Sequence, residues 1–475
     1  MKNKNIKRWL AVVLAAALVL GLTACGNGGS TTTTKAPDAS STTTGAPSTS
    51  GTQTAEAPSN EDLPLSPRTI MGTVVPTVTG YAWGPAVDTV TIRLEDEVSF
   101  KEEDRWTDYA EYFTVSEKKK GIASISETKR TITKALFKDE KTLTLMLQVG
   151  PEEGSPFNYN MATWRNTWAE NYEIVFSMAD GKTLEMADGE QIILKAEQEN
   201  EITDADMPQL ELFSWDNDYI GAEGHTLSYA YFDPGNGSED NLRPLVIWLH
   251  GAGEGGTDPR IALYGNQVTR LNQYYLQEPL RGAYVLVPQC PTFWMQYTES
   301  GSWSDNPGKD SVYLHDLKEL IDFFVAENHV DPDRIIIAGC SNGGYMTMDM
   351  ILNYPDYFAA AIPICEAYNP AGITDEQLEK IKDLPIWFIY AKNDTTVNPK
   401  VFEEPLIERL TALGAPIHVS AFDDVHDTTG MFEKNGQPYQ YNGHWSWIYF
   451  FNWEVWDDNL HISAWMDQVN RSRAE

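Results

Sequence analysis

Residues 334–344 read RIIIAGCSNGG, a β-branched run that ends in a glycine-rich turn around Ser341. The spacing of Gly339, Ser341 and Gly343 is the Gly-x-Ser-x-Gly pattern of a nucleophile on a sharp turn between a strand and a helix. The glycines are needed because such a turn leaves no room for side chains beside the serine. The hydroxyl then lies at a helix N-terminus, where backbone N–H groups stabilise an oxyanion. The stretch therefore predicts a nucleophilic serine on an α/β sheet.

A second glycine-rich loop reads HGAGEGG at residues 250–256 and directly follows an apolar run. In folds with this serine turn, a loop at that position supplies the second oxyanion donor. Small residues allow backbone N–H groups to approach the substrate oxygen closely. We therefore expect the oxyanion to be bound by the backbone N–H of Asn342 and by that of Ala252 or Gly251. A plain tight turn is the alternative for this loop taken alone.

An acid and a base are expected after the serine, in the chain order Ser, Asp, His. Asp394 lies just past the apolar run at residues 385–390, where it can orient an imidazole and stabilise its charge. The last predicted strand is residues 417–422, and the two candidates for the base, His426 and His444, lie after it. We expect His444, which stands at the start of a predicted helix, to be the general base. His426, flanked by three aspartates, is the alternative.

The other apolar runs alternate with helical patterns. Short runs without polar residues are typical of parallel strands that are buried on both faces of a sheet. These runs are residues 244–249, 284–288, 334–338, 358–364, 385–390 and 417–422. One apolar stripe of a helix is formed by Leu317, Leu320, Ile321, Phe324 and Val325. The alternation predicts a doubly wound, mostly parallel α/β sheet.

Four segments together resemble a known family. They are GCSNGGYMT at residues 339–347, HGAGEGG at 250–256, VPQCP at 287–291 and GHWSW at 443–447. They resemble secreted bacterial esterases of the α/β-hydrolase fold, related to polyhydroxybutyrate depolymerases and to feruloyl or acetyl esterases, some of them described as predicted peptidases. The resemblance implies a serine carboxylesterase. Its substrate would be an acyl, feruloyl or acetyl ester of a plant polysaccharide, or a similar small ester.

Residues 67–208 are rich in predicted strands. The runs at residues 89–94 and 142–149 alternate with the period of two that marks a half-buried strand, and Asp-Gly turn signals follow further along. Short strands and turns predict a β-sandwich. The segment VTGYAWGP at residues 78–85 resembles the Ig-like N-terminal domain of such esterases. The hydrolase domain is then residues 209–475, and we expect the sandwich, which holds no triad candidate, to be dispensable for the chemistry.

The chain begins with the features of a lipoprotein signal. Basic residues precede an apolar run at residues 9–21 that is too short to span a bilayer, and the run ends in LTAC. This resembles a bacterial lipobox with acylation at Cys25, although an ordinary secretory signal is the alternative. We expect a signal peptide at residues 1–24 and a disordered Ser/Thr/Pro-rich tether at residues 25–66. The protein would then be exported and held at the extracytoplasmic face of the cell membrane by its lipid alone.

The amino-acid composition limits the kinds of molecule that the protein can bind. The chain has 35 Lys and Arg against 69 Asp and Glu, a net charge of -34, which excludes a general nucleic-acid binder. Four cysteines are too few for a disulfide scaffold, and Cys290, Cys340 and Cys365 either include one disulfide or are free thiols. The sequence has no Cys/His metal spacing and no calcium-loop signature, so we expect neither a metal nor a cofactor.

Tryptophans near the predicted active-site loops are candidates for holding a substrate. They are Trp294, Trp303 and Trp445, although packing in the core is the commoner role for any single tryptophan. Two other functions stay open at this point. One is a serine peptidase of the prolyl-oligopeptidase-like type, which uses the same triad. The other is an inactive lipoprotein that binds carbohydrate or a surface.

Overall fold

The computed structural model describes residues 66–104, 106–121, 124–299 and 306–471. Within the chain, Arg68–Glu475 forms one compact unit. The predicted signal peptide, Cys25, the tether up to residue 65 and Trp303 lie outside the described residues. None of the described helices is both long enough and apolar enough to cross a membrane.

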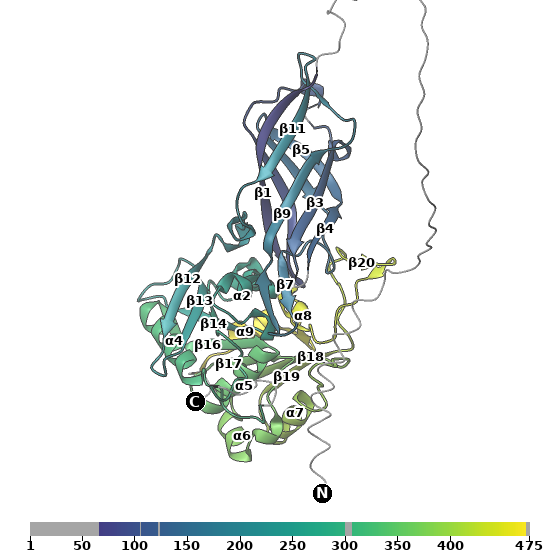
Figure 1. Cartoon of the computed structure of the whole chain (residues 1–475). Coiled ribbons are helices and arrows are strands. Elements are labelled where there is room, and N and C mark those ends of the chain that lie inside the picture. The colour runs from purple at the N-terminus through teal and green to yellow at the C-terminus, as the bar shows by residue number, and fades with distance from the viewer. Residues whose placement is uncertain (1–65, 105, 122–123, 300–305, 472–475) are drawn as a thin grey trace, which may run out of the picture. The chain divides into compact units, whose positions relative to one another are not determined.

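The C-terminal part is built on one eight-stranded sheet (Figure 1). Its strands, in spatial order, are β12 (Phe213–Ile220), β13 (Thr226–Phe232), β15 (Tyr284–Gln289), β14 (Arg243–Leu249), β16 (Val330–Cys340), β17 (Ala360–Ile364), β18 (Ile386–Ala391) and β19 (Ile417–Phe422). The first three pair antiparallel, and every pair from β15 onward is parallel. All six strands predicted from apolar runs are present, which confirms the mostly parallel sheet. The antiparallel β12 and β13 add an edge that was not predicted.

Both faces of this sheet are covered by helices. Along β14, Leu245 and Ile247 face one core, whereas Val246 and Trp248 face the other. The first core also contains apolar side chains of α4 (Leu314–Glu327), α5 (Asn342–Asn353), α6 (Asp375–Ile381) and α7 (Glu403–Ala412). The second contains those of α2 (Pro259–Gly265), α3 (Tyr274–Gln277), α8 (Trp447–Phe451) and α9 (Ile462–Gln468). Burial on both faces explains why β14, β16, β17 and β18 are apolar over their buried lengths.

The N-terminal strands form two main sheets and a hairpin. The six-stranded sheet has the order β10 (Leu184–Glu185), β11 (Gln191–Gln198), β1 (Arg68–Tyr81), β2 (Gly84–Leu94), β6 (Thr142–Leu147) and β5 (Ile132–Asp139). The three-stranded sheet has the order β4 (Ile125–Arg130), β3 (Phe113–Lys120) and β9 (Glu170–Met178), and the hairpin pairs β7 (Phe157–Asn160) with β8 (Arg165–Trp168). Apolar side chains from both main sheets, such as Ile92 and Ile174, belong to one core.

The same core continues into the C-terminal part. Val78 of β1 and Tyr264 of α2 both belong to it, and the Tyr264 hydroxyl donates to the Val78 carbonyl at 3.2 Å. A Cβ on Gly80 would lie 2.6 Å from the Tyr264 ring, so the strand and the helix are in close contact. The predicted boundary at residues 208 and 209 falls at the 3₁₀ turn η4 (Pro208–Leu210). The N-terminal part therefore has no core separate from that of the C-terminal part, whose sheet also packs a second core against α4 to α7.

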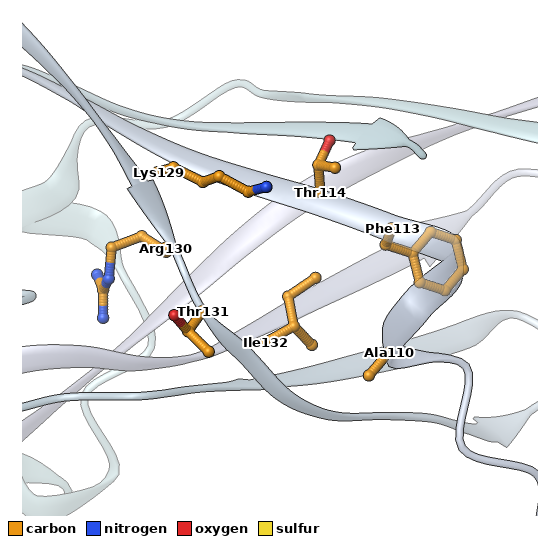
Figure 2. A pocket seen from close by; sticks show the side chains of 7 residues that line it. All are labelled: Ala110, Phe113, Thr114, Lys129, Arg130, Thr131 and Ile132. Atoms are coloured by element: carbon orange, nitrogen blue, oxygen red, sulfur yellow. The ribbon is translucent and has the colours of Figure 1, made fainter. Parts of the chain in front are cut away.

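A cavity of about 330 Å³ lies in the N-terminal part (Figure 2). It is lined by Ala110, Phe113, Thr114, Lys129, Arg130, Thr131 and Ile132. Figure 2 shows the Arg130 guanidinium directed away from Phe113 and Ile132, and this group pairs with Glu117 at 2.8 Å. None of the residues predicted to carry chemistry lines this cavity.

Candidate active site

Ser341 occupies the turn between β16 and α5 with φ +55° and ψ -113°. Such a backbone conformation costs a non-glycine residue on the order of 1–3 kcal/mol and persists only where the surroundings enforce it. Here the Ser341 N–H donates to the Ile364 carbonyl of β17 at 2.8 Å. The Ser341 carbonyl accepts from the Tyr345 N–H at 2.9 Å, inside the first turn of α5. The sheet and the helix therefore hold the serine from both sides.

The glycines of the motif stand where neighbouring strands leave no space. A Cβ on Gly343 would lie 2.0 Å from the Leu249 carbonyl oxygen, at the end of β14. A Cβ on Gly339 would lie 2.5 Å from the Gly343 carbonyl oxygen. Both separations are far below any real carbon–oxygen contact, and backbone atoms cannot swing aside as a side chain can. This agrees with the steric reason for the Gly-x-Ser-x-Gly spacing.

The structure brings Ser341, His444 and Asp394 into one hydrogen-bonded chain. His444 Nε2 lies 2.8 Å from Ser341 Oγ, and His444 Nδ1 lies 2.7 Å from Asp394 Oδ2. The other oxygen of Asp394 accepts the backbone N–H groups of Thr396 at 2.7 Å and Val397 at 2.9 Å. Asp394 and His444 are 3% and 8% exposed, so their interaction is weakly screened by solvent.

His444 is held in place by the loop around it. It lies three residues before α8, and its backbone N–H donates to Asn442 Oδ1 at 2.9 Å. A Cβ on Gly443 would lie 2.9 Å from the backbone carbonyl carbon of Asn393, so a side chain here would press on the loop of the predicted acid. The Trp447 ring meets the imidazole edge-on, with ring centroids 5.8 Å apart.

His426 does not reach the serine. Its Nδ1 pairs with Asp424 at 2.6 Å and lies 3.3 Å from the Tyr449 hydroxyl, with 43% of the side chain exposed. The interactions are those of a surface loop.

The predicted oxyanion donors begin an α-helix and a 3₁₀ turn. Asn342 is the first residue of α5, and Ala252 is the first residue of the 3₁₀ turn η5 (Ala252–Glu254). The first N–H groups of a helix have no acceptor within it, so both are available to an oxygen of a substrate. Both follow the carboxyl ends of neighbouring parallel strands, β16 and β14.

His250 fixes the direction of one of these donors. Its Nδ1 lies 2.7 Å from the Gly251 carbonyl, and its Nε2 accepts the Cys290 N–H at 3.2 Å. Burial lowers the pKa of His250 to about 4, so the ring is neutral and Nδ1 carries the proton. Because the peptide unit is planar and trans, holding the Gly251 carbonyl turns the N–H of Ala252 the opposite way. This favours Ala252 over Gly251, and sequence reasoning had not given His250 any role.

The predicted substrate tryptophans differ in position. Trp294 is fully buried, its ring packs against His250 and Tyr313, and its backbone N–H donates to Asn342 Oδ1 at 2.7 Å. The indole therefore belongs to the core beneath the site. Trp445 is only half-buried and lies against Tyr441 and Trp447. Cys290, Cys340 and Cys365 are buried free thiols.

The fold can be compared with that of a solved structure, a thermostable esterase. The likeness covers 84% of this chain and 99% of that chain, with a TM-score of 0.65 and 24% sequence identity. The chain has the α/β-hydrolase fold. Residues 209–475 make up too little of the chain to supply this coverage alone, so the likeness also includes residues of the N-terminal part.

Three further similarities concern the sequence. The family described as "Prolyl oligopeptidase family" matches residues 302–396, which include Ser341 and Asp394. Poly(3-hydroxyalkanoate) depolymerase C of Paucimonas lemoignei is 42% identical over 48 residues, 10% of this chain and 12% of that protein. A probable carboxylesterase SOBER1-like of Arabidopsis thaliana is 28% identical over 170 residues, 33% of this chain and 62% of that protein. This chain thus spans 12% and 62% of the lengths of these two relatives. The similarities in sequence and in fold confirm the predicted resemblance to esterases of the α/β-hydrolase fold.

Glu366 and Glu403 are buried carboxyl groups, and Glu403 interacts electrostatically with both Glu366 and the predicted acid Asp394. Burial raises the pKa of Glu366 to about 8 and that of Glu403 well above its usual value. The raised pKa values favour the protonated forms, which spares Asp394 the repulsion of a charged Glu403. No sequence motif marked either glutamate. Among the residues that the structure describes, no group of three or more His, Cys, Asp or Glu is arranged to hold a metal ion.

The hairpin β7–β8 of the N-terminal part contacts the loops on the oxyanion side. Asn166 Nδ2 donates to Glu254 Oε1 at 3.2 Å, and Arg165 donates to the Pro291 carbonyl at 2.8 Å. The Trp168 indole N–H donates to Asp258 at 2.9 Å.

The N-terminal part also contacts the long loop that carries His444. The Phe432 ring meets Tyr81 and Trp83 edge-on, with centroids 5.8 and 5.7 Å apart, and Lys434 pairs with Glu152 at 2.8 Å. Both loops beside Ser341 are thus supported by residues before 209. We now expect the N-terminal part to be needed for the chemistry, contrary to the expectation from the absence of triad residues.

The Asp394–His444 pair leads to a prediction about pH. Burial alone would lower the pKa of His444, but the attraction of Asp394 and their hydrogen bond raise this pKa well above its usual value. Since the neutral imidazole is the base, kcat/KM should rise as the pH increases through this pKa and level off above it. Asp394→Asn should lower kcat about 10⁴-fold, because the wrong tautomer is then held, and move the midpoint to lower pH. A pH series of kcat/KM on both proteins measures this, and an unshifted midpoint would contradict it.

Proposed function

We propose that this chain is a serine hydrolase that cleaves carboxylic esters through an acyl-enzyme. The observation that carries the proposal is the hydrogen-bonded chain from Ser341 through His444 to Asp394, with spacings of 2.8 and 2.7 Å, on a strained turn. Two helix-start N–H groups stand at the ends of the neighbouring strands for the oxyanion. This is the constellation that acyl transfer by a serine requires.

In acylation, Ser341 Oγ forms a bond to the ester carbonyl carbon while His444 Nε2 takes the hydroxyl proton. The Asp394 carboxylate stabilises the imidazolium that forms. The N–H groups of Asn342 and Ala252 donate to the carbonyl oxygen as it becomes negative, which lowers the energy of the tetrahedral intermediate. The intermediate collapses by breaking the ester C–O bond, and His444 gives its proton to the departing alkoxide, which leaves as the alcohol.

Deacylation repeats these steps with water. His444 Nε2 takes a proton from a water molecule as the water oxygen bonds to the acyl carbon. The second tetrahedral intermediate is bound by the same N–H groups. When the bond to Ser341 Oγ breaks, the serine recovers its proton from His444 and the carboxylic acid leaves. The balance is ester plus water to acid plus alcohol.

The substrate class we propose is a neutral acyl, feruloyl or acetyl ester, free or linked to a plant polysaccharide. The net charge of -34 disfavours a strongly anionic substrate. The half-buried Trp445 packs against Trp447, whose ring meets His444, and a partly exposed indole can accept an aryl group or the face of a sugar.

A serine peptidase is the second candidate. It is favoured by the match of the prolyl oligopeptidase family to residues 302–396. The purified protein should be given acetyl, feruloyl, hydroxybutyryl and short acyl esters beside proline-type peptide amides. We expect kcat/KM to be higher for at least one ester class than for every amide. Faster amide cleavage would support the peptidase, and no cleavage together with no covalent labelling of Ser341 would support an inactive binding lipoprotein.

We further propose that the protein is an exported lipoprotein anchored through Cys25, with the Ser/Thr/Pro-rich segment as a tether and an Ig-like N-terminal domain. The order of basic residues, apolar run and LTAC at residues 22–25 supports the anchor. The sheets of residues 68–198 and their shared core support the sandwich.

Cys25→Ala should abolish lipid labelling. The thiol is the acceptor of the lipid, so the variant protein should be released into the medium or remain unprocessed in cells. Metabolic labelling with palmitate and fractionation measure this, with Cys290→Ala as the control that should label normally. A Cys25→Ala protein that still labels and stays in the membrane would rule out the lipobox.

A further inference from the structure

Glu254 is a buried acid inside the loop at residues 250–256, which we call the oxyanion loop. It closes the 3₁₀ turn that Ala252 begins, and it is 6% exposed. Its Oε1 accepts the amide of Asn166, a residue of β8 that lies 88 positions earlier in the chain. Burial raises the pKa of Glu254 to about 7, so this carboxyl depends on its few donors when it is charged.

The oxyanion loop is clamped between the hairpin and α2. A Cβ on Gly253 would lie 2.9 Å from Asn166 Nδ2, and a Cβ on Gly265 of α2 would lie 2.5 Å from Glu254 Cγ. A Cβ on Gly251 would lie 3.0 Å from Glu254 Oε2. The loop therefore touches Asn166 on one side and α2 on the other.

The rest of the loop is tied to the segment after β15. The Gln289 side-chain amide donates to the Glu254 carbonyl at 2.7 Å, and the Gly256 N–H donates to the Cys290 carbonyl at 2.9 Å. Arg165, next to Asn166, donates to the carbonyl of Pro291 in the same segment. The hairpin thus holds the oxyanion loop directly through Asn166 and indirectly through Arg165.

We propose that Asn166, on the N-terminal part, is a positioning residue that acts through Glu254 to aim the Ala252 N–H at the substrate oxyanion. The proposal rests on the proposed esterase function. An oxyanion donor is effective only within about 2.7–3.1 Å of the oxygen, and removal of one donor costs about 10²–10³ in kcat. Without the hydrogen bond from Asn166, the oxyanion loop would place the Ala252 N–H correctly for only part of the time. The oxyanion would then be stabilised less.

Asn166→Ala should lower kcat about tenfold to a hundredfold and leave KM within about twofold, because the lost interaction is made in the transition state. Its affinity for a trifluoromethyl ketone, which forms an oxyanion on the serine, should fall by a similar factor. The matched control is Asn158→Ala on the facing strand, whose amide donates to the Lys120 carbonyl and not to the loop. The control should keep kcat, KM and inhibitor affinity.

A donor–acceptor exchange separates positioning from general damage. Asn166→Asp should have a low kcat, because the introduced carboxyl group would then face that of Glu254. Adding Glu254→Gln supplies an amide that donates in the reverse direction, to the carboxylate introduced on β8. The double variant should therefore regain most of the lost kcat.

The outcomes distinguish this proposal from the esterase proposal. If the parent protein is not labelled at Ser341 by a fluorophosphonate, the esterase proposal fails first. If the parent is labelled and active, the positioning role is overturned by an Asn166→Ala protein with unchanged kcat, or by one whose kcat falls without loss of inhibitor affinity. If Asn166→Ala does not fold, the positioning role is overturned by a soluble double variant whose kcat is as low as that of Asn166→Asp.

Discussion

Ser341→Ala is expected to lower ester hydrolysis by about 10⁴–10⁶-fold, the loss found when a triad nucleophile is removed. The alanine retains the backbone turn but has no oxygen to attack the carbonyl carbon. Covalent labelling by a fluorophosphonate should disappear with the activity. Rates of release of an aryl alcohol and labelling on a gel measure both effects.

The fold should survive this change, because His444 Nε2 is the single hydrogen-bond partner of the hydroxyl among the residues that the structure describes. The thermal unfolding midpoint of the variant is therefore expected near that of the parent. Ser116→Ala is a suitable control, since this exposed hydroxyl bonds only to Glu127 in the N-terminal part. Labelling that persists at another serine in Ser341→Ala would move the nucleophile elsewhere.

His444→Ala should be as inactive as Ser341→Ala. Without the imidazole, the hydroxyl proton has no acceptor 2.8 Å away and the departing alkoxide has no donor. Members of a triad act as a unit, so the double variant should be no slower than either single one. Single-turnover and steady-state rates on one activated ester measure the three proteins.

His426→Ala is the matched control and should keep most of kcat. His426 is bonded to Asp424 and Tyr449 at the surface and makes no contact with Ser341. An inactive His426→Ala beside an active His444→Ala would reverse the assignment of the base.

The central sheet and the serine turn could be predicted because each leaves a recognisable pattern within a short stretch of the sequence. Burial on both faces makes β14, β16 and β18 apolar over their buried lengths, and that pattern is visible in the sequence. The close contact of Gly343 with the Leu249 carbonyl likewise fixes a glycine at a set distance from Ser341. In contrast, β12 and β13 alternate or carry polar residues at an antiparallel edge, where only one face must be apolar.

The choice of base was harder because the loop before His444 is long. The structure removes that difficulty, since the loop pairs with itself. Asp427 N–H donates to the Tyr439 carbonyl and Tyr441 N–H donates to the Val425 carbonyl, both at 2.8 Å. The chain therefore leaves the end of β19 near Val425 and returns to it by Tyr441. No local propensity at residues 423–441 indicated this closure.

The support given by the N-terminal part could not be predicted from the sequence. Asn166 and Glu254 are 88 residues apart, and neither belongs to a motif that pairs them. Their contact depends on how β8 lies against the oxyanion loop, which is a tertiary property. For the same reason Trp294, which lies just beyond a predicted strand, could not be assigned to the core before its burial was known.

The most direct test of the proposed ester hydrolysis through Ser341 is to trap the acyl-enzyme. A slowly deacylated aryl ester should be mixed with the purified protein, quenched in acid within one turnover, and the protein digested for mass spectrometry. We predict that the acyl group is found on Ser341, in an amount equal to the burst of aryl alcohol released. A burst with the acyl group on another residue, or turnover of the ester with no acyl group on Ser341, would contradict the account.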